Sequence, residues 1–282
     1  MGMGRGFAEE LLLGANQVLG FNLKRICLEG PEEELKKTEI AQPAIFVISA
    51  AAFHQLTAHR SLLTADLCAV AGHSLGEYSA LYAAGSISFE DGIRILNLRG
   101  RYMQEAVPIG AGAMMAVLGL DRDKIEKCCL DAGEDVSCAN FNSPGQVVIS
   151  GESSAVERAA NLCKKAGAKR VIPLQVSAPF HCKLMASAQE KLAREIEKIK
   201  ITDAQIPVVA NVNAEYVTSA DKIKELLIAQ VTAPVLWEDS IKRMVADGIS
   251  EFIEVGPGKV LAGLIKKINP EVSVKSYEEV IK

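Results

Sequence analysis

The segment around Ser74 constrains the fold of this chain more than any other stretch of its sequence. Residues 67–72 form a short apolar run typical of a buried strand, and residues 75–84 have the pattern of a helix. Between them stands Gly72-His73-Ser74-Leu75-Gly76, a Gly-x-Ser-x-Gly sequence. A sharp strand-to-helix turn with an exposed serine requires small residues two positions either side of that serine. The sequence therefore predicts a strand, a tight turn and a helix with Ser74 at its N-terminus.

Strand-like and helix-like segments alternate along the rest of the chain, which favours an α/β fold with a mainly parallel sheet, α/β-hydrolase-like around the serine. On the two flanks we expect helices at 5–19, 42–58, 88–105, 186–198, 220–231, 240–247 and 260–268, and strands at 207–211 and 251–255. In the middle we expect a strand at 112–118, a helix at 121–132, strands at 136–140 and 146–150, a helix at 153–166 and a strand at 170–176.

The middle order, β-α-β-β-α-β, is typical of a ferredoxin-like unit. We therefore predict a large α/β domain made of residues 1–107 and 178–282, with a ferredoxin-like small domain of residues 108–177 inserted into it. A length of 282 residues suits about two domains.

Composition narrows the functional classes. The net charge of −4 lacks the basic excess of most nucleic-acid-binding proteins. The longest apolar run, residues 43–53, is well short of the ~20 residues that a membrane-spanning helix needs, and no signal-peptide pattern is visible. We therefore expect a cytoplasmic protein that binds neither nucleic acid nor a membrane.

The cysteines form no metal-binding or disulfide pattern. Their number is odd and no Cys-x-x-Cys occurs, so neither a zinc site nor a disulfide framework is indicated. In a cytosolic protein such cysteines are typically buried and reduced. We expect buried free thiols at Cys27, Cys68, Cys128, Cys129, Cys138, Cys163 and Cys182.

A serine needs a base to become a nucleophile, and the chain offers four histidines. His54 and His59 lie within and near the end of an apolar helix, which is typical of packing or surface residues. His73 adjoins Ser74 on the strand side, where its side chain points away from the serine. His181 follows the predicted small domain, where the chain returns to the large one, so it is the candidate base, with a purely structural histidine as the alternative.

One arginine falls on the apolar face of the predicted helix 88–105. By the 3.6-residue period, Arg99 lies in the middle of an apolar arc, while Arg94 and Arg101 lie on the polar side. The arc consists of Ile95, Leu96, Tyr102 and Met103. A buried guanidinium is costly unless an anion meets it, and a carboxylate suits its two parallel donors. That carboxylate could belong to the protein or to a ligand.

The decapeptide at residues 72–81, Gly-His-Ser-Leu-Gly-Glu-Tyr-Ser-Ala-Leu, closely resembles the malonyl-CoA:acyl carrier protein transacylases of fatty-acid synthesis. The similarity covers essentially the whole chain, with several separate motifs in the family's order. These further motifs lie at residues 98–106, 140–146, 177–182, 230 with 234–237, and 254–259.

The resemblance implies a role for each candidate residue. Ser74 would carry the malonyl ester, His181 would act as base and then acid, and Arg99 would pair with the malonyl carboxylate. The backbone N–H of Leu75 would stabilise the oxyanion. The main-chain carbonyl of Gln230 would orient His181 in place of a triad carboxylate.

The resemblance also extends to the substrates. Phe180, just before His181, is similar to acyltransferases that select malonyl, and Asn142 and His73 complete the expected substrate-binding residues. The implied partners are malonyl-CoA and the phosphopantetheine thiol of a holo-acyl carrier protein, with no metal and no cofactor.

The beginning of the sequence departs from the family pattern. Members of the family open with a strand ending in Gly-Gln-Gly-Ser-Gln, just before a segment like Gly2-Met3-Gly4, and this sequence starts after that strand. The missing glutamine would supply a second oxyanion N–H, and losing one such donor typically costs ~10²–10³ in rate. We therefore expect weaker activity from this sequence than from a version with the strand restored.

Other functions share parts of this pattern. The serine turn also occurs in thioesterases and lipase-like hydrolases, although Arg99 on an apolar face argues against a neutral substrate. An acyltransferase of polyketide assembly would differ mainly in its carrier. A non-catalytic form that only docks a carrier protein is the third alternative.

Overall fold

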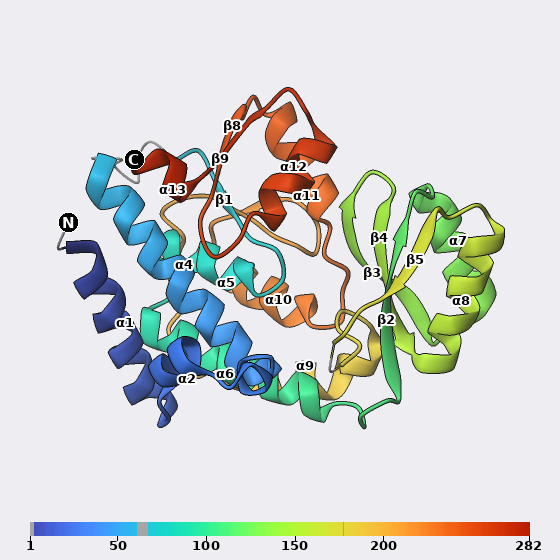
Figure 1. Ribbon diagram of the computed structural model, residues 1–282, viewed down its shortest axis with the longest axis horizontal. Helices are drawn as coiled ribbons and strands as arrows, with labels where there is room; N and C mark the ends of the chain where they lie inside the picture. The colour runs from blue at the N-terminus through green and yellow to red at the C-terminus, as the bar shows by residue number, and fades with distance from the viewer. Residues whose placement is uncertain (1–2, 61–66, 177) are drawn as a thin grey trace.

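The structure is a computed structural model that describes residues 3–60, 67–176 and 178–282 (Figure 1). Gly2 and residue 177, the predicted end of the small domain, lie outside these ranges. Most helices form a large region, and a four-stranded sheet with two helices stands beside it at the right of Figure 1. The chain therefore has the α/β fold that the alternation of segments predicts.

Helices dominate the large region and build its core. They are α1 (Met3–Leu19), α2 (Leu23–Glu29), α3 (Glu32–Leu35), α4 (Thr38–Arg60), α5 (Gly76–Ala83), α6 (Phe89–Glu105), α9 (Ala186–Ile196) after the short 3₁₀ helix η2 (Lys183–Met185), α10 (Ala220–Gln230), α11 (Trp237–Ala246), α12 (Val260–Ile268) and α13 (Tyr277–Val280). The predicted helices are present with shifted ends, whereas α2, α3 and α13 were not predicted. These three span only 4 to 7 residues, too few to show a helical period.

The α4–α6 pair carries the large core. Ser88 caps α6 by accepting the N–H of Asp91 at 3.0 Å, as its position before the helix predicts. A Cβ at Gly100 of α6 would come within 2.5 Å of the carbonyl oxygen of Thr38, so the missing side chain lets the two helices approach closely. This close approach positions the inward face of α6, which carries Arg99, against α4.

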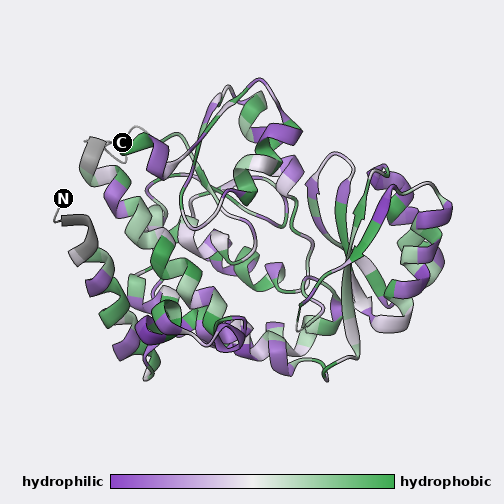
Figure 2. Cartoon of the chain, viewed as in Figure 1, coloured by the Kyte–Doolittle hydropathy of each residue, from purple (hydrophilic) through white to green (hydrophobic). Residues whose placement is uncertain are grey.

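Helix α4 is long and apolar enough to cross a membrane by length and composition alone. Hydrophobic colours predominate along it in Figure 2. It packs against α1, α5 and α6, and 61% of its apolar window is buried inside the protein. Such burial is what a core helix requires.

The strands of the large region are short. β1 (Val70–Ala71) pairs in parallel with β6 (Val208–Val209), which pairs antiparallel with β7 (Tyr216–Val217), and β8 (Glu251–Glu254) pairs in parallel with β9 (Ser273–Ser276). The strand predicted over 67–72 therefore has only two residues in its ladder, and β7 and β9 were not predicted. A cavity of about 1370 Å³ lies between β1, β8, α4 and α12.

The small region is regular by comparison. Its elements are β2 (Gly112–Leu118), α7 (Arg122–Ala132), β3 (Val136–Ser143), β4 (Gln146–Glu152), α8 (Ser153–Lys165) and β5 (Arg170–Pro173). All neighbouring strands are antiparallel in the order β3-β4-β2-β5, and α7 and α8 cover the sheet on its outer side in Figure 1. The element order is the β-α-β-β-α-β that the sequence predicts.

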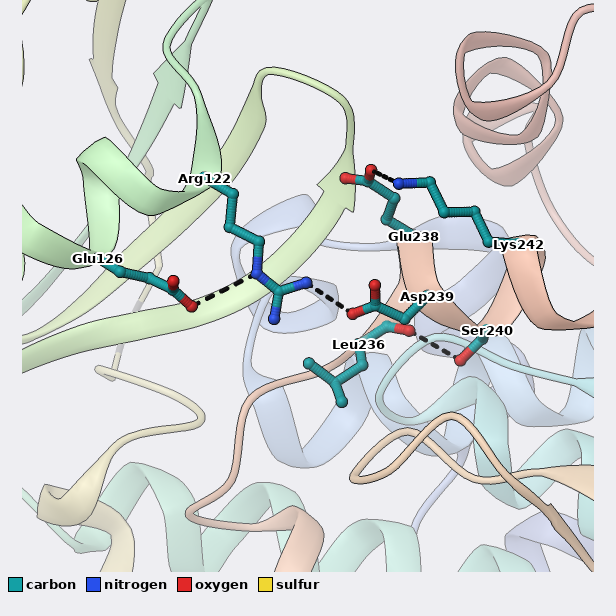
Figure 3. A network of polar contacts seen from close by, with 7 residues as sticks. All are labelled: Arg122, Glu126, Leu236, Glu238, Asp239, Ser240 and Lys242. Carbon is teal, nitrogen blue, oxygen red and sulfur yellow. Dashed lines mark hydrogen bonds and ion pairs between the residues drawn. The ribbon is translucent and has the colours of Figure 1, made fainter.

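Strand β3 joins the two regions. Its edge pairs with the segment before α11, because the N–H of Phe141 donates to the carbonyl of Val235 and the N–H of Val235 donates to the carbonyl of Ala139, both at 2.9 Å. Figure 3 shows a second link, in which Arg122 of α7 reaches Asp239 of α11 at 2.7 Å. The small sheet is thereby fixed against the segment that follows α10.

All seven cysteines are free. Five are buried as predicted, but Cys27 is half-buried and Cys68 is exposed, which corrects the expectation for these two. Cys68 lies within the predicted strand 67–72 but before the observed strand β1, which begins at Val70.

Candidate active site

The turn between β1 and α5 holds Ser74 in a strained conformation. Ser74 has φ 53°, in the left-handed region that non-glycine residues rarely adopt. A Cβ at Gly72 would lie 1.9 Å from the carbonyl oxygen of Gly76, so only glycine fits there, whereas a Cβ at Gly76 would meet open space. The expected need for small residues on both sides therefore holds on one side only.

Asn211 braces this turn. Its Oδ1 accepts the backbone N–H of Ser74 at 2.7 Å, and its Nδ2 donates to the carbonyl of Gly72 at 2.7 Å. Both bonds are buried or nearly so, and they link the turn to the segment that follows β6. An amide that satisfies one donor and one acceptor of the turn stabilises a backbone conformation that is otherwise unfavourable.

The structure brings His181 to Ser74. The Nε2 atom of His181 lies 2.7 Å from the Ser74 Oγ, and its Nδ1 lies 2.9 Å from the Gln230 carbonyl oxygen and 3.2 Å from that of Ala233. Because carbonyls only accept, Nδ1 carries the proton and Nε2 is left to accept the serine hydroxyl. His181 is 3% exposed and has φ 58°, so it too is held in a strained conformation.

The imidazole is held neutral. Burial, followed by the nearby positive charge of Arg99, lowers the pKa of His181 to about 3. At neutral pH the ring therefore has a free lone pair on Nε2, which is the form that a general base requires.

Arg99 is buried beside the serine, as its place in the apolar arc predicts, with 2% of its surface exposed. Its Nη1 donates to Gln42 Oε1 at 2.8 Å, and its Nη2 donates to Ser74 Oγ and Gln230 Oε1, both at 3.0 Å. In the described ranges no carboxylate lies within 4.0 Å of the guanidinium, and its buried Nε–H has no hydrogen-bond partner.

The sequence leaves open whether the carboxylate that pairs with Arg99 belongs to the protein or to a ligand. The guanidinium is met by neutral side chains, not by a direct carboxylate partner within the part of the chain that the structure describes. Burial lowers the pKa of Arg99, with Tyr78 and Glu77 acting in the opposite direction. A cation held among neutral acceptors next to a nucleophile is suited to an anionic ligand.

Two groups near Ser74 could serve an oxyanion. Leu75 caps α5, and among the described residues its backbone N–H has no partner, unlike that of Ser74. The positive end of the α5 dipole lies at the same place. The free N–H fits the oxyanion role that the resemblance assigns to Leu75, and that role stays a prediction.

The remaining predicted residues lie around this centre. His73 does not approach the serine as a base; its Nε2 lies 2.8 Å from Asn142 Oδ1, so these two predicted substrate-binding residues contact each other. Phe180 is partly buried and packs against both the large core and the apolar cluster of the small sheet. His54 is exposed and its ring packs at a tilt against Phe7, and the side chain of His59 is outside the described set.

Three polar residues of the site were not predicted from the sequence. They are Gln42, Glu77 and Asn211. Glu77 had a signal, because it is a charged residue in the first turn of the predicted helix that follows Ser74. Gln42 and Asn211 had none. Within the described ranges no group of three or more His, Cys, Asp or Glu side chains could hold a metal ion.

Comparison with known proteins gives one consistent result. The family model described as "Acyl transferase domain" matches residues 14–280. The malonyl CoA-acyl carrier protein transacylase of Escherichia coli (strain K12) is 47% identical over 273 residues, which are 96% of this chain and 87% of that protein.

Solved structures agree. An acyl carrier protein S-malonyltransferase from Vibrio cholerae superposes with a TM-score of 0.94 at 44% identity, covering 98% of this chain and 92% of that one. A malonyl-transacylase solved in complex with its type II PKS acyl-carrier protein superposes with a TM-score of 0.91 at 44% identity, covering 96% and 87%.

Proposed function

The chain belongs to the acyl transferase domain family, and we propose that it transfers a malonyl group from malonyl-CoA to the phosphopantetheine thiol of an acyl carrier protein. The carrier serves fatty-acid synthesis, and the protein works in the cytoplasm. The similar proteins are named for malonyl-CoA and for an acyl carrier protein, which supports these two substrates. The buried Arg99, 3.0 Å from the Ser74 hydroxyl and without a carboxylate partner in the described ranges, is the observation that carries the proposal.

The first half of the reaction forms an ester on Ser74. The malonyl carboxylate binds Arg99, and the Ser74 Oγ attacks the thioester carbonyl while His181 Nε2 takes its proton. The carbonyl oxygen becomes an oxyanion, which the Leu75 N–H stabilises. The C–S bond then breaks, and CoA leaves as its thiol with the proton returned by His181.

The second half reverses these roles. The phosphopantetheine thiol enters, gives its proton to His181, and attacks the ester carbonyl. The bond to the Ser74 oxygen breaks, and His181 returns the proton to that oxygen. Every step moves only protons and the acyl group, so the proposed transfer uses no metal and no redox cofactor.

Gln230 keeps the base aligned. Its carbonyl oxygen accepts the Nδ1 proton of His181, so Nε2 always faces Ser74. A carbonyl carries less charge than a triad carboxylate and stabilises the imidazolium less strongly. The positive charge of Arg99 further disfavours a long-lived imidazolium.

The test is intact-protein mass spectrometry after brief exposure to malonyl-CoA and acid quenching. We expect the mass of one malonyl group on the wild type and none on Ser74→Ala. Ser79→Ala is the matched control, because Ser79 lies in α5, the helix that follows Ser74, and its Oγ has no hydrogen-bond partner among the described residues; it should be labelled like the wild type. Absence of label on the wild type would refute the proposal.

Measurements of the products separate the other candidate functions. Release of free malonate without transfer to a carrier would indicate a hydrolase. The neighbour solved with a polyketide carrier favours a second candidate, transfer to carriers of that class. Rates with a fatty-acid carrier and a type II polyketide carrier, measured side by side, distinguish the two pathways.

A further inference from the structure

Gln230 joins three parts of the site through one fully buried side chain. Its Nε2 donates to the Ser74 carbonyl at 3.0 Å and to Glu77 Oε2 at 2.8 Å, and its Oε1 accepts from Arg99 Nη2 at 3.0 Å. Its backbone carbonyl accepts the proton of His181. The side chain therefore contacts the arginine while the main chain orients the base.

The direction of the Gln230 amide matters. In the observed direction the NH₂ group faces two oxygen acceptors and the oxygen faces a guanidinium donor. In the flipped direction the oxygen would face the ionised Glu77 carboxylate and the Ser74 carbonyl, and the NH₂ group would face Arg99, so each of these contacts would be repulsive. The Ser74 carbonyl and Glu77 Oε2, which accept from Gln230 Nε2, therefore fix the position of Gln230 Oε1, the atom that accepts from Arg99.

Glu77 is the stronger of these two acceptors. It is 2% exposed, and its Oε2 also accepts the backbone N–H of Asn211 at 3.1 Å. Within the described ranges no lysine or arginine forms an ion pair with it. A buried carboxyl group without a direct cation is costly, so packing alone does not explain its presence in the apolar core.

Glu77 also balances the charge of Arg99 across the amide. The amide NH₂ faces the carboxyl group and the amide oxygen faces the guanidinium, so the amide dipole is aligned between the acidic group and the cation. This alignment lowers the energy of the buried cation without a direct ion pair that would occupy the arginine donors.

We propose that Glu77 is a positioning residue, which fixes the Gln230 amide and thereby holds the Arg99 guanidinium beside Ser74 in the geometry that receives the substrate carboxylate. The inference rests on the proposed function, because it takes Arg99 as the group that binds malonyl. Glu77 itself touches neither substrate nor the reacting atoms.

The inference predicts a selective loss. Glu77→Leu keeps the volume and removes the acceptor, and we expect kcat/KM for malonyl-CoA to fall about 10- to 100-fold, the effect of a small misplacement of a binding group. Transfer from acetyl-CoA, which has no carboxylate, should fall less than about threefold. A merely structural role would lower both rates together with the melting temperature.

Two further variants distinguish a positioning role of Glu77 from a merely structural one. Glu77→Gln retains an acceptor oxygen and should keep malonyl transfer within about threefold of the wild type. Glu238→Leu is the matched control, because Glu238 is the other buried glutamate among the described residues and pairs with Lys242 outside this network (Figure 3). Its malonyl-to-acetyl ratio should not change.

A double-mutant cycle tests whether Glu77 acts through Gln230. In a Gln230→Leu background, Glu77→Leu should cause no further change in the malonyl-to-acetyl ratio. Additive losses would overturn the inference, and so would equal losses for the two substrates in folded Glu77→Leu. Should Glu77→Leu fail to fold, Glu77→Asp, which withdraws the acceptor by one methylene, replaces it and should reduce the ratio at least about threefold.

Failure of the proposed function remains distinguishable. Arg99→Ala is measured in the same assay. If the wild type transfers malonyl and Arg99→Ala changes the malonyl-to-acetyl ratio but Glu77→Leu does not, the inference fails alone. If Arg99→Ala leaves the ratio unchanged, the assigned role of Arg99 fails and the inference fails with it.

Discussion

The large and small regions bury different kinds of side chain. The large region buries Arg99, Glu77, His181 and Gln230, each at most 3% exposed. Between residues 112 and 173, all of which the structure describes, no charged side chain is buried. The small sheet has an apolar core of the ordinary kind, whereas the large region holds titratable groups that an apolar core would exclude.

Backbone strain follows the same division. In the described ranges the non-glycine residues with positive φ are Ser74, His181 and Ala214, and all belong to the large region. Between residues 112 and 173 only glycines have positive φ. Strain and buried charge concentrate where the chemistry is proposed, so mutations there should affect activity, and core mutations in the small sheet should affect stability.

The largest expected effect is that of His181→Ala. Removing the base should lower kcat/KM for malonyl transfer about 10⁴-fold or more. Thermal unfolding should show only a moderate loss of stability, because one buried ring and its hydrogen bonds to the Gln230 and Ala233 carbonyls are lost. Initial rates and melting curves check both statements, and a variant with more than a tenth of wild-type activity would contradict the proposed separation of roles.

Ile149→Ala tests the opposite side of the comparison. Ile149 lies in β4 and is completely buried in the small core. Its truncation should reduce the free energy of unfolding by about 2–5 kcal/mol, while kcat/KM per folded molecule stays within about threefold.

Denaturant titration and rates under native conditions measure the two quantities for Ile149→Ala. The control is Leu130→Ala on α7, a side chain that is 79% exposed and should change neither. A tenfold loss of activity in folded Ile149→Ala would show that the regions are not separable.

Arg99→Ala should have a selective effect inside the large region. We expect kcat/KM for malonyl-CoA to fall about 10²-fold, equivalent to about 2.7 kcal/mol, and acetyl transfer to be tolerated better. Arg94→Ala is the control, because Arg94 lies on the exposed face of the same helix and pairs with Asp91. An unchanged malonyl preference in Arg99→Ala would remove its assigned role.

The smallest effect concerns pH and stability. Burial raises the pKa of Glu77 to about 7, so between about pH 4.5 and 7 the folded state binds more protons than the unfolded state, and the stability contributed by Glu77 is lost as pH rises. His181, with its pKa lowered to about 3, has the opposite effect below about pH 6.5, where stability falls with falling pH.

The variant Glu77→Gln isolates the contribution of Glu77 to the pH dependence of stability. The unfolding free energy of Glu77→Gln relative to the wild type should be higher at pH 8 than at pH 5, because the variant has no carboxyl group to ionise in the core. Denaturant titrations at the two pH values measure the difference in unfolding free energy. A difference that does not change with pH would show that Glu77 in the folded protein does not titrate between pH 5 and pH 8.

Local patterns gave the long elements and part of the site. Helices of ten or more residues show the 3.6-residue period clearly, which is why α6 and its buried Arg99 were predicted. The two-residue strands β1, β6 and β7 have no period to detect, so β7 was missed and β1 was predicted too long. Gln42 and Asn211 act through contacts with distant segments, and no local pattern marks them.

The sequence by itself determined the fold class, the turn that strains Ser74 and the burial of Arg99, because each depends on residues a few positions apart. Only the tertiary structure decided that Ser74 and His181, 107 residues apart, lie 2.7 Å from each other. It also decided that Arg99 meets Gln42 and Gln230 and no nearby carboxylate in the described ranges. Such contacts depend on how α4, α6 and α10 pack together, which local periodicity does not encode.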